Sequence, residues 1–255
     1  MTIIRNRKQL PPFGYLKDRD IDIQNLVSYC NKKNLLNQEK YEDVNVTKDN
    51  HPTGSSYTDF VIANEFCKEH FFKEKEARHM EGKKYRQLYL TEFDKSKRSE
   101  KVTLKNTTIF ERTKRLNPNN SRYLPEADER NYGKRNKLAT GIIGDLLDSF
   151  KSPLARVRFA YLAPGFNIKP HVDYDPSYIV RFHIPLITNE KCTLGVKLKG
   201  EKKEVHLPAN GKIYFVNTGY VHWANNNSDE SRIHLIIDVQ KQDDLRGLVE
   251  YNNYI

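Results

Sequence analysis

The first 150 residues place apolar side chains at helical spacing in three separate stretches. The stretches span 20–33, 56–71 and 138–150, and their apolar positions recur every three or four residues. A run at 85–93 reads as a strand instead. We therefore expect residues 1–150 to be mainly helical, with long polar connections. The apolar positions are Ile23, Leu26, Val27 and Cys30, then Phe60, Ala63, Cys67 and Phe71, then Leu138, Ile142, Leu146 and Phe150.

The pattern changes near residue 155, where short runs rich in β-branched and aromatic residues follow one another. Turn-forming pairs such as Pro164–Gly165 and Asn210–Gly211 separate them, and no helical stretch intervenes. Many short strands joined by tight turns are typical of a sandwich or barrel. We expect a single domain over 1–255, with a barrel in 151–255 and supporting, lid and substrate-selecting elements in 1–150. The runs span 156–163, 177–187, 192–199, 203–207, 212–217 and 232–239.

Two of these runs repeat an Arg-x-His pattern. Successive side chains of a strand point to opposite faces, so Arg181 and His183 share one face of the run 177–187. Arg232, His234 and Asp238 share one face of the run 232–239 in the same way. These polar faces are either the solvated sides of half-exposed strands or the wall of a polar site. Alternation alone does not decide between the two interpretations.

Two histidines and an aspartate add a metal-binding pattern. His171 and Asp173 lie on the same side of an extended segment, and His222 follows 49 residues after Asp173. Two imidazoles and one carboxylate suit one face of an octahedral Fe(II) and leave three positions open. Arg232 follows His222 by ten residues, and a cation there suits the distal carboxylate of a dicarboxylic co-substrate. A His-x-Asp pair alone is a weak signal, but the four residues together are specific.

The motifs YLAPG, HVD, RFHIPLITN and HWANNNSDESRIHLIID span the same region, residues 155–240. This region resembles the aspartyl/asparaginyl β-hydroxylase type of Fe(II)/2-oxoglutarate oxygenase, whose superfamily includes the proline cis-hydroxylases. The resemblance implies a double-stranded β-helix, a cupin-like jelly roll, packed against N-terminal helices. It also implies that His171, Asp173 and His222 are the catalytic iron ligands.

The same resemblance implies where the co-substrate binds. Arg232 is expected to pair with the C5 carboxylate of 2-oxoglutarate, and Arg181 and His183 to lie near its C1 carboxylate. The implied reaction uses O₂ to hydroxylate an amino acid, free or within a peptide, and releases succinate and CO₂. Because Asp173 supplies a carboxylate that halogenating relatives lack, we expect hydroxylation rather than halogenation.

Five further residues are weaker candidates for substrate contact. Tyr174 and Asp175 directly follow the metal motif. Arg158 and Tyr161 are expected on one face of the run 156–163. Trp223 adjoins the last iron ligand, where packing is favoured over substrate contact.

Charge leaves two alternatives open. The chain has 43 Lys and Arg against 33 Asp and Glu, a net charge of +10. The segment from Asp94 to Lys137 holds 13 of the basic and six of the acidic residues, and reads as a solvated face. An oxygenase acting on a ribosomal protein or nucleic acid is the first alternative. A non-catalytic cupin-like binding module is the second.

Cysteine usage and hydropathy exclude further classes. The three cysteines lie far apart with no CxxC pair, so neither a disulfide scaffold nor a cysteine zinc site is expected. No apolar run is long enough to span a bilayer, and no apolar stretch follows the basic start. We expect a cytoplasmic protein with no membrane partner.

Overall fold

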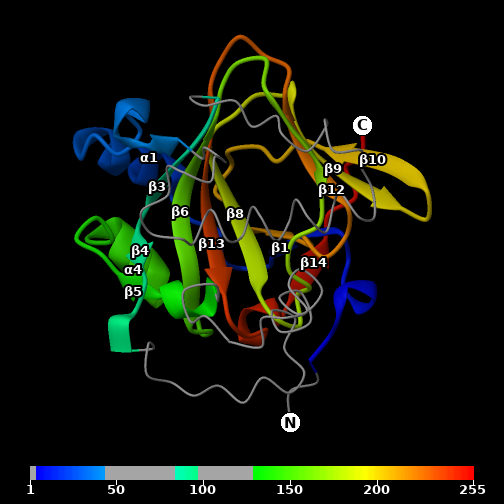
Figure 1. Cartoon of the computed structure of the whole chain (residues 1–255), viewed down its shortest axis with the longest axis horizontal. Helices are drawn as coiled ribbons and strands as arrows, with labels where there is room; N and C mark the ends of the chain where they lie inside the picture. The colour runs from blue at the N-terminus through cyan, green and yellow to red at the C-terminus, as the bar shows by residue number, and fades with distance from the viewer. Residues whose placement is uncertain (1–3, 44–83, 97–128) are drawn as a thin grey trace, which may run out of the picture.

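Two β-sheets packed face to face form the body of the molecule (Figure 1). The computed structural model describes residues 4–43, 84–96 and 129–255. The large sheet contains, in spatial order, β14 (Leu248–Glu250), β1 (Phe13–Leu16), β11 (Tyr214–Val216), β8 (Val180–Ile187), β13 (Arg232–Val239), β6 (Leu154–Leu162), β3 (Tyr85–Tyr89) and β2 (Glu42–Asp43). The small sheet contains β10 (Glu201–Val205), β9 (Cys192–Leu198), β12 (His222–Asn226) and β7 (Asn167–His171).

The chain winds back and forth between these two sheets from β6 to β13. Strands β6, β8, β11 and β13 belong to the large sheet, whereas β7, the β9–β10 hairpin and β12 belong to the small sheet. All the strand pairings among them are antiparallel. This path is that of a jelly roll. The predicted double-stranded β-helix is therefore confirmed.

The described part of residues 1–150 contains two of the three expected helices and adds strands to the large sheet. The helix expected in 20–33 is α1 (Ile23–Lys32), capped by the Asp22 carboxylate, which accepts from the Asn25 amide at 3.0 Å. The stretch 138–150 forms a shorter helix, α4 (Ile142–Asp148). The helix expected at 56–71 lies outside the described residues. The strand expected at 85–93 is confirmed as β3 followed by β4 (Thr91–Glu92), which pairs with β5 (Lys134–Arg135).

Helix α4 begins late because Gly141 precedes it with a φ of +56°. A residue in that left-handed conformation cannot continue a helix from 138. The buried face also differs by one position from the expectation, since Ile143 and Leu147 are fully buried while Ile142 is only partly buried. Among the described residues, no helix is long and apolar enough to cross a membrane.

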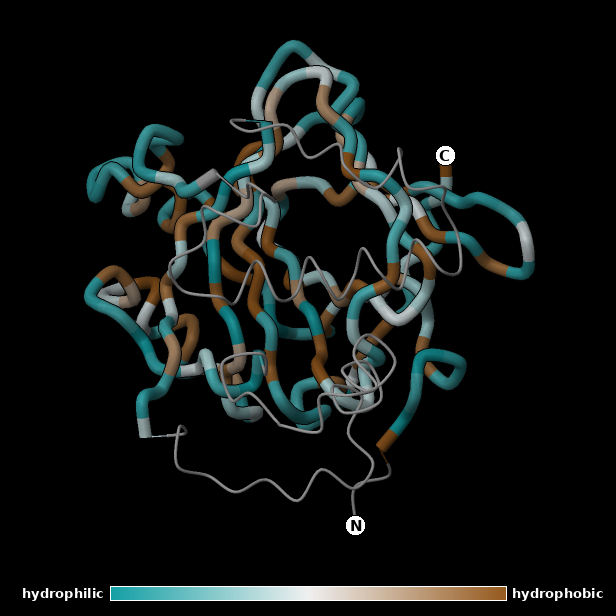
Figure 2. The backbone as a smooth tube through the Cα atoms, in the orientation of Figure 1, coloured by the Kyte–Doolittle hydropathy of each residue, from teal (hydrophilic) through white to brown (hydrophobic). Residues whose placement is uncertain are grey.

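The main apolar core lies between the outer face of the large sheet and the two helices. Leu26 and Cys30 of α1 and Ile143 and Leu147 of α4 belong to one cluster with apolar residues of β6, β8 and β13. Those strand residues are Val157, Phe159, Tyr161, Val180, Phe182, Ile184, Leu186, Ile233, Leu235, Ile237 and Val239. The strands alternate between hydrophobic and hydrophilic positions (Figure 2). Their other face therefore turns toward the small sheet.

A second cluster fills one end of the space between the sheets. Its members come from both sheets: Phe13, Leu162, Tyr214 and Val216 of the large sheet and Leu194, Val196, Val205 and Ala224 of the small one. The rest of the inner face of β6, β8 and β13 carries buried charged and polar side chains. That polar region lines the site described next.

Candidate metal centre

His171, Asp173 and His222 converge at the end of the small sheet. His171 is the last residue of β7, and His222 begins the neighbouring strand β12 as its register partner. Their imidazole centroids are 4.2 Å apart. Asp173 lies 3.8 Å from Nε2 of His171 through Oδ1 and 3.7 Å from Nε2 of His222 through Oδ2. One ligand atom from each residue falls within 4.8 Å of the others, a spacing and donor set that suit Fe(II).

Backbone carbonyls orient both imidazoles. Nδ1 of His171 lies 2.8 Å from the carbonyl oxygen of Lys169, and Nδ1 of His222 lies 3.0 Å from that of Tyr220. A carbonyl only accepts, so each Nδ1 carries the proton and each Nε2 turns its lone pair toward the cluster. Burial and the neighbouring His171 lower the pKa of His222 to about 3. His222 is therefore neutral at physiological pH, the form that binds a metal.

The two loops that carry the ligands are tied to each other and to the N-terminal segment. The Asp173 amide donates to the Thr218 carbonyl at 3.0 Å, and the Thr218 hydroxyl donates to the Tyr174 carbonyl at 3.1 Å. Arg7 spans both loops, because its amide donates to Asp175 at 3.2 Å and its guanidinium to the Gly219 carbonyl at 2.6 Å. These bonds fix the relative position of the segments that carry His171, Asp173 and His222.

Arg181, which the family resemblance places near the C1 carboxylate, contacts two carboxylates of the protein itself. Its Nη1 donates to Oδ2 of Asp173, while Nε and Nη2 donate to the two oxygens of Asp238 at 2.7 and 3.0 Å. Arg158 donates to the same Asp238 at 2.8 Å. Burial alone would raise the pKa of Asp238, but the Arg181 and Arg158 guanidinium groups outweigh it and hold that pKa well below its usual range.

Arg232, His234 and His183 form a second cluster on the inner face. Arg232 approaches both ring nitrogens of His234, at 3.1 Å through Nε and 2.9 Å through Nη2, and Nδ1 of His234 lies 3.2 Å from Nδ1 of His183. Burial lowers the pKa of Arg232 to about 10 and, together with Arg232, holds those of both histidines well below their ordinary value. Within the described residues, no carboxylate pairs with Arg232. A buried cation without an acidic partner suits an anionic ligand.

Tyr85 and Gln87 of β3 extend this polar wall and were not identified from the sequence. Register places Tyr85 and Arg232 on either side of Leu162, and Gln87 and His234 on either side of Ala160. Gln87 is buried and donates to the Tyr85 hydroxyl at 2.5 Å. Applying strand alternation to the run 85–93 would have placed both side chains on one face, as it did for Arg181 and His183.

Of the weaker candidates, Trp223 and Tyr161 point away from the metal centre, whereas Arg158 lies on the inner face. Trp223 follows His222 in β12 and turns to the opposite face of the small sheet, where its Nε1 donates to Glu204 at 2.7 Å. Arg158 and Tyr161 lie on opposite faces of β6, so the expectation of one shared face was wrong. They are three residues apart, and alternation puts Tyr161 in the outer core and Arg158 against Asp238.

Tyr174 and Asp175 lie next to the centre but have structural contacts. Tyr174 is buried in a small cluster with Tyr178, with ring centroids 5.0 Å apart. The Asp175 carboxylate accepts from the Ser177 amide and hydroxyl at 2.9 and 2.7 Å and also from Arg7. Asp175 thereby shapes the turn that follows the metal motif.

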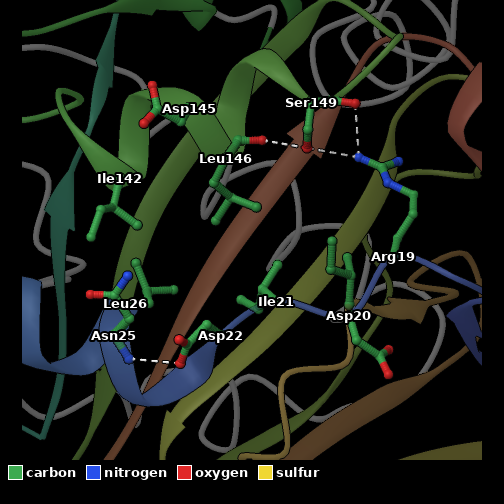
Figure 3. Close-up of a pocket in the computed structure, with 11 residues that line it drawn as sticks. Arg19, Asp20, Ile21, Asp22, Asn25, Leu26, Ile142, Asp145, Leu146 and Ser149 are labelled. Carbon is green, nitrogen blue, oxygen red and sulfur yellow. Dashed lines mark hydrogen bonds between the residues drawn. The ribbon is translucent and has the colours of Figure 1, made fainter.

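A separate hollow of about 360 Å³ lies on the outer side of the large sheet between α1 and α4 (Figure 3). Arg19 reaches across it to Ser149, donating to the carbonyl and the hydroxyl at 3.0 Å each. Asp22 and Asp145 lie at its wall. No residue predicted to belong to the functional site lines this hollow. Most of the basic segment from Asp94 to Lys137 lies outside the described residues.

Comparison with known proteins matches the chain to one enzyme family. A sequence model described as aspartyl/asparaginyl beta-hydroxylase matches residues 62–242, well beyond the 155–240 that carry the resemblance. Among solved structures, a 2OG-Fe(II) oxygenase family oxidoreductase from Burkholderia pseudomallei is 13% identical, with 62% of this chain and 69% of that chain covered and a TM-score of 0.35. A cupin domain from Bordetella pertussis is 16% identical over 36% of this chain and 88% of that chain, with a TM-score of 0.28. Because the family model spans most of its length, the chain belongs to the aspartyl/asparaginyl β-hydroxylase family of non-haem iron oxygenases.

Proposed function

We propose that the protein is an Fe(II)/2-oxoglutarate-dependent hydroxylase that oxidises an amino-acid side chain, free or within a peptide. One observation carries the proposal: a buried guanidinium, Arg232, lacks an acidic partner among the described residues and shares the interior of the sandwich with the cluster of His171, Asp173 and His222. An iron oxygenase that uses a dicarboxylic co-substrate needs both features. The family match favours an enzyme over a non-catalytic binding module.

In this proposal the protein binds the metal and orients the reactants. The Nε2 atoms of the two histidines and one oxygen of Asp173 hold Fe(II), and the carbonyls at Nδ1 keep the rings from turning. Arg232 binds the distal carboxylate of 2-oxoglutarate. The bound iron, co-substrate and O₂ supply the oxidation of a C–H bond to an alcohol, with succinate and CO₂ as co-products.

Arg181 and His183 remain predicted contacts of the C1 carboxylate. His183 is neutral and lies against His234, so it offers a hydrogen bond rather than a charge. Arg181 has five N–H donors, and three of them are already engaged by Asp173 and Asp238. The family name points to aspartyl or asparaginyl residues of a peptide as the first substrates to test.

The experiment is an anaerobic titration of the full chain with Fe(II) and 2-oxoglutarate, monitored by visible absorption. We expect a metal-to-ligand charge-transfer band that requires both additions and is absent in His171→Ala and His222→Ala. His206→Ala is the matched control, because His206 also bonds a carbonyl through Nδ1, at 2.9 Å from Cys192, yet lies outside the cluster. No band in folded wild-type protein would refute the proposal.

A further inference from the structure

A buried ionic network lies directly behind the metal centre. Its members are Arg156 and Arg158 of β6, Arg181 of β8, Asp238 of β13, Glu129 of the short 3₁₀ turn Glu129–Tyr132, and Asp173. Arg156 pairs with Glu129 at 2.9 Å, and Arg181 lies 4.0 Å from the same carboxylate. Three cations face three anions, so the formal charges balance when Asp173 is ionised.

Asp173 is the member of this network that faces the metal centre. Its side chain is 21% exposed, whereas those of Asp238 and Glu129 are 0% and 3% exposed. Asp238 and Glu129 are thus buried deeper than Asp173, which alone of the three acidic members belongs to the metal cluster.

Asp238 fixes the orientation of Arg181. Its carboxylate accepts hydrogen bonds from Nε and Nη2 of Arg181 at 2.7 and 3.0 Å. This bidentate pair is planar and holds the guanidinium in one orientation. Arg158 holds Asp238 from the other side at 2.8 Å. With these two nitrogens engaged, Nη1 of Arg181 projects to Oδ2 of Asp173.

We propose that Arg158, Asp238 and Arg181 form a positioning relay that holds Oδ2 of Asp173 and presents Oδ1 to the metal as the single carboxylate ligand atom. A carboxylate held in this way binds the metal through one oxygen, which leaves coordination positions for the co-substrate and O₂. Asp238 is thus a positioning residue that touches neither metal nor substrate. The relay rests on the proposed iron site and gives Arg181 a role in addition to its predicted contact with the co-substrate.

The test is a Co(II) titration of the full chain, read by ligand-field absorption, which needs no turnover. Asp238→Asn removes the charge that clamps Arg181, so we expect the Co(II) affinity to fall about 10- to 100-fold and the absorption bands to shift. The matched control is Asp244→Asn, because Asp244 is an equally buried carboxylate that pairs with Arg19 at 2.8 Å away from the site. This control is expected to keep wild-type affinity and bands.

A second variant covers the case in which Asp238→Asn does not fold. The double variant Arg158→Gln/Asp238→Asn removes one cation and one anion together, so the remaining network stays balanced while Arg181 loses its clamp. We expect the same loss of Co(II) affinity. Wild-type affinity and bands in either folded variant would overturn the relay. Failure of the wild-type chain itself to bind Co(II) would instead overturn the proposed iron site.

Discussion

Arg232 is costly to bury and therefore informative. Taking a guanidinium out of water without an acidic partner is unfavourable. In place of a carboxylate, Arg232 contacts the ring nitrogens of His234. Such a residue lowers the stability of the empty protein and gains its partner when an anion binds. Substituting Arg232 should therefore lower the affinity for the co-substrate and raise the stability of the protein without co-substrate.

Arg232→Gln is expected to weaken 2-oxoglutarate binding by at least about 30-fold. Removing one partner of a buried charge pair lowers the binding free energy by about 2 kcal/mol or more. The unfolding free energy of the protein without co-substrate should stay equal or rise. Calorimetric titration of the metal-loaded protein and urea denaturation measure the two quantities. Arg19→Gln, which breaks the pair with the buried Asp244 away from the site, should leave the affinity unchanged. A parallel loss of affinity and stability would contradict this account.

His183 and His234 make the stability of the fold depend on pH. Burial and Arg232 hold both pKa values well below 6.5 in the folded protein, so the unfolded chain binds more protons below that pH. Stability is therefore lost as the pH falls through about 6.5, at about 1.4 kcal/mol per pH unit for each histidine. Urea midpoints at several pH values between 7.5 and 5.5 check this. His234→Gln should flatten the slope, and an unchanged slope would count against the assignment.

At the residue scale, the sequence predicted which side chains meet but not what some of them do. Alternation placed Arg181 with His183, and Asp238 with Arg232, on one face of their runs, and the pattern of His171, Asp173 and His222 predicted a metal cluster. Sequence pattern could not show that Arg181 pairs with Asp238 and Asp173, because that depends on the register between β8 and β13. The same limit applies to Glu129, which joins the network from the 3₁₀ turn Glu129–Tyr132.

At the scale of elements, the β9–β12 pair shows how the small sheet is packed. Gly195 of β9 is the register partner of Trp223, and the indole covers it so closely that a Cβ atom there would lie 1.9 Å from Cε2. The glycine thus leaves room for a ring whose N–H is held by Glu204 of β10. This packing fixes strand β12, which begins with His222.

Gly195→Ala is expected to displace the indole and lower the unfolding free energy by about 1–3 kcal/mol, the usual cost of overpacking. Chemical denaturation followed by fluorescence measures it directly, since Trp223 is the one tryptophan of the chain. Lys197→Ala, on the exposed face of the same strand, should change stability by no more than about 0.5 kcal/mol. Equal effects of the two substitutions would contradict the packing argument.

Strand prediction succeeded where apolar residues alternate and failed where they do not. The runs at 156–163, 177–187 and 232–239 correspond to β6, β8 and β13. The strand β12 has the sequence His-Trp-Ala-Asn-Asn, which has no strong strand propensity, so its existence follows from pairing with β9 and β7 rather than from its own sequence.

At the scale of the whole molecule, the start of the chain completes the structure. Strand β1 lies between β11 and β14. Its residues therefore pair with residues about 200 or more positions later in the sequence. Asn217 donates to the carbonyls of Arg7 and Pro11 at 3.0 and 3.2 Å, which anchors the segment ahead of β1 beside the metal centre. No local pattern in residues 4–16 indicates this docking, because it depends on contacts distant in sequence.

Two truncations separate the tasks of this segment. Removal of residues 1–11 takes away the Arg7 bridge but leaves β1, so we expect metal affinity to fall while unfolding stays cooperative. Removal of residues 1–17 also deletes β1 and exposes the edges of β11 and β14, so cooperative unfolding should be lost. Metal titration and thermal melts compare the two. Cooperative melting of the longer truncation would show that β1 is dispensable.

Strand β7, which carries His171, is one of the two edge strands of the small sheet. An uncovered outermost strand invites pairing with a second copy of the chain, and a short strand bearing proline and lysine discourages it. Pro170 has no N–H to offer such a copy, and Lys169 would bring like charges together. We therefore expect the residues beside His171 to discourage pairing of this edge with a second copy of the chain.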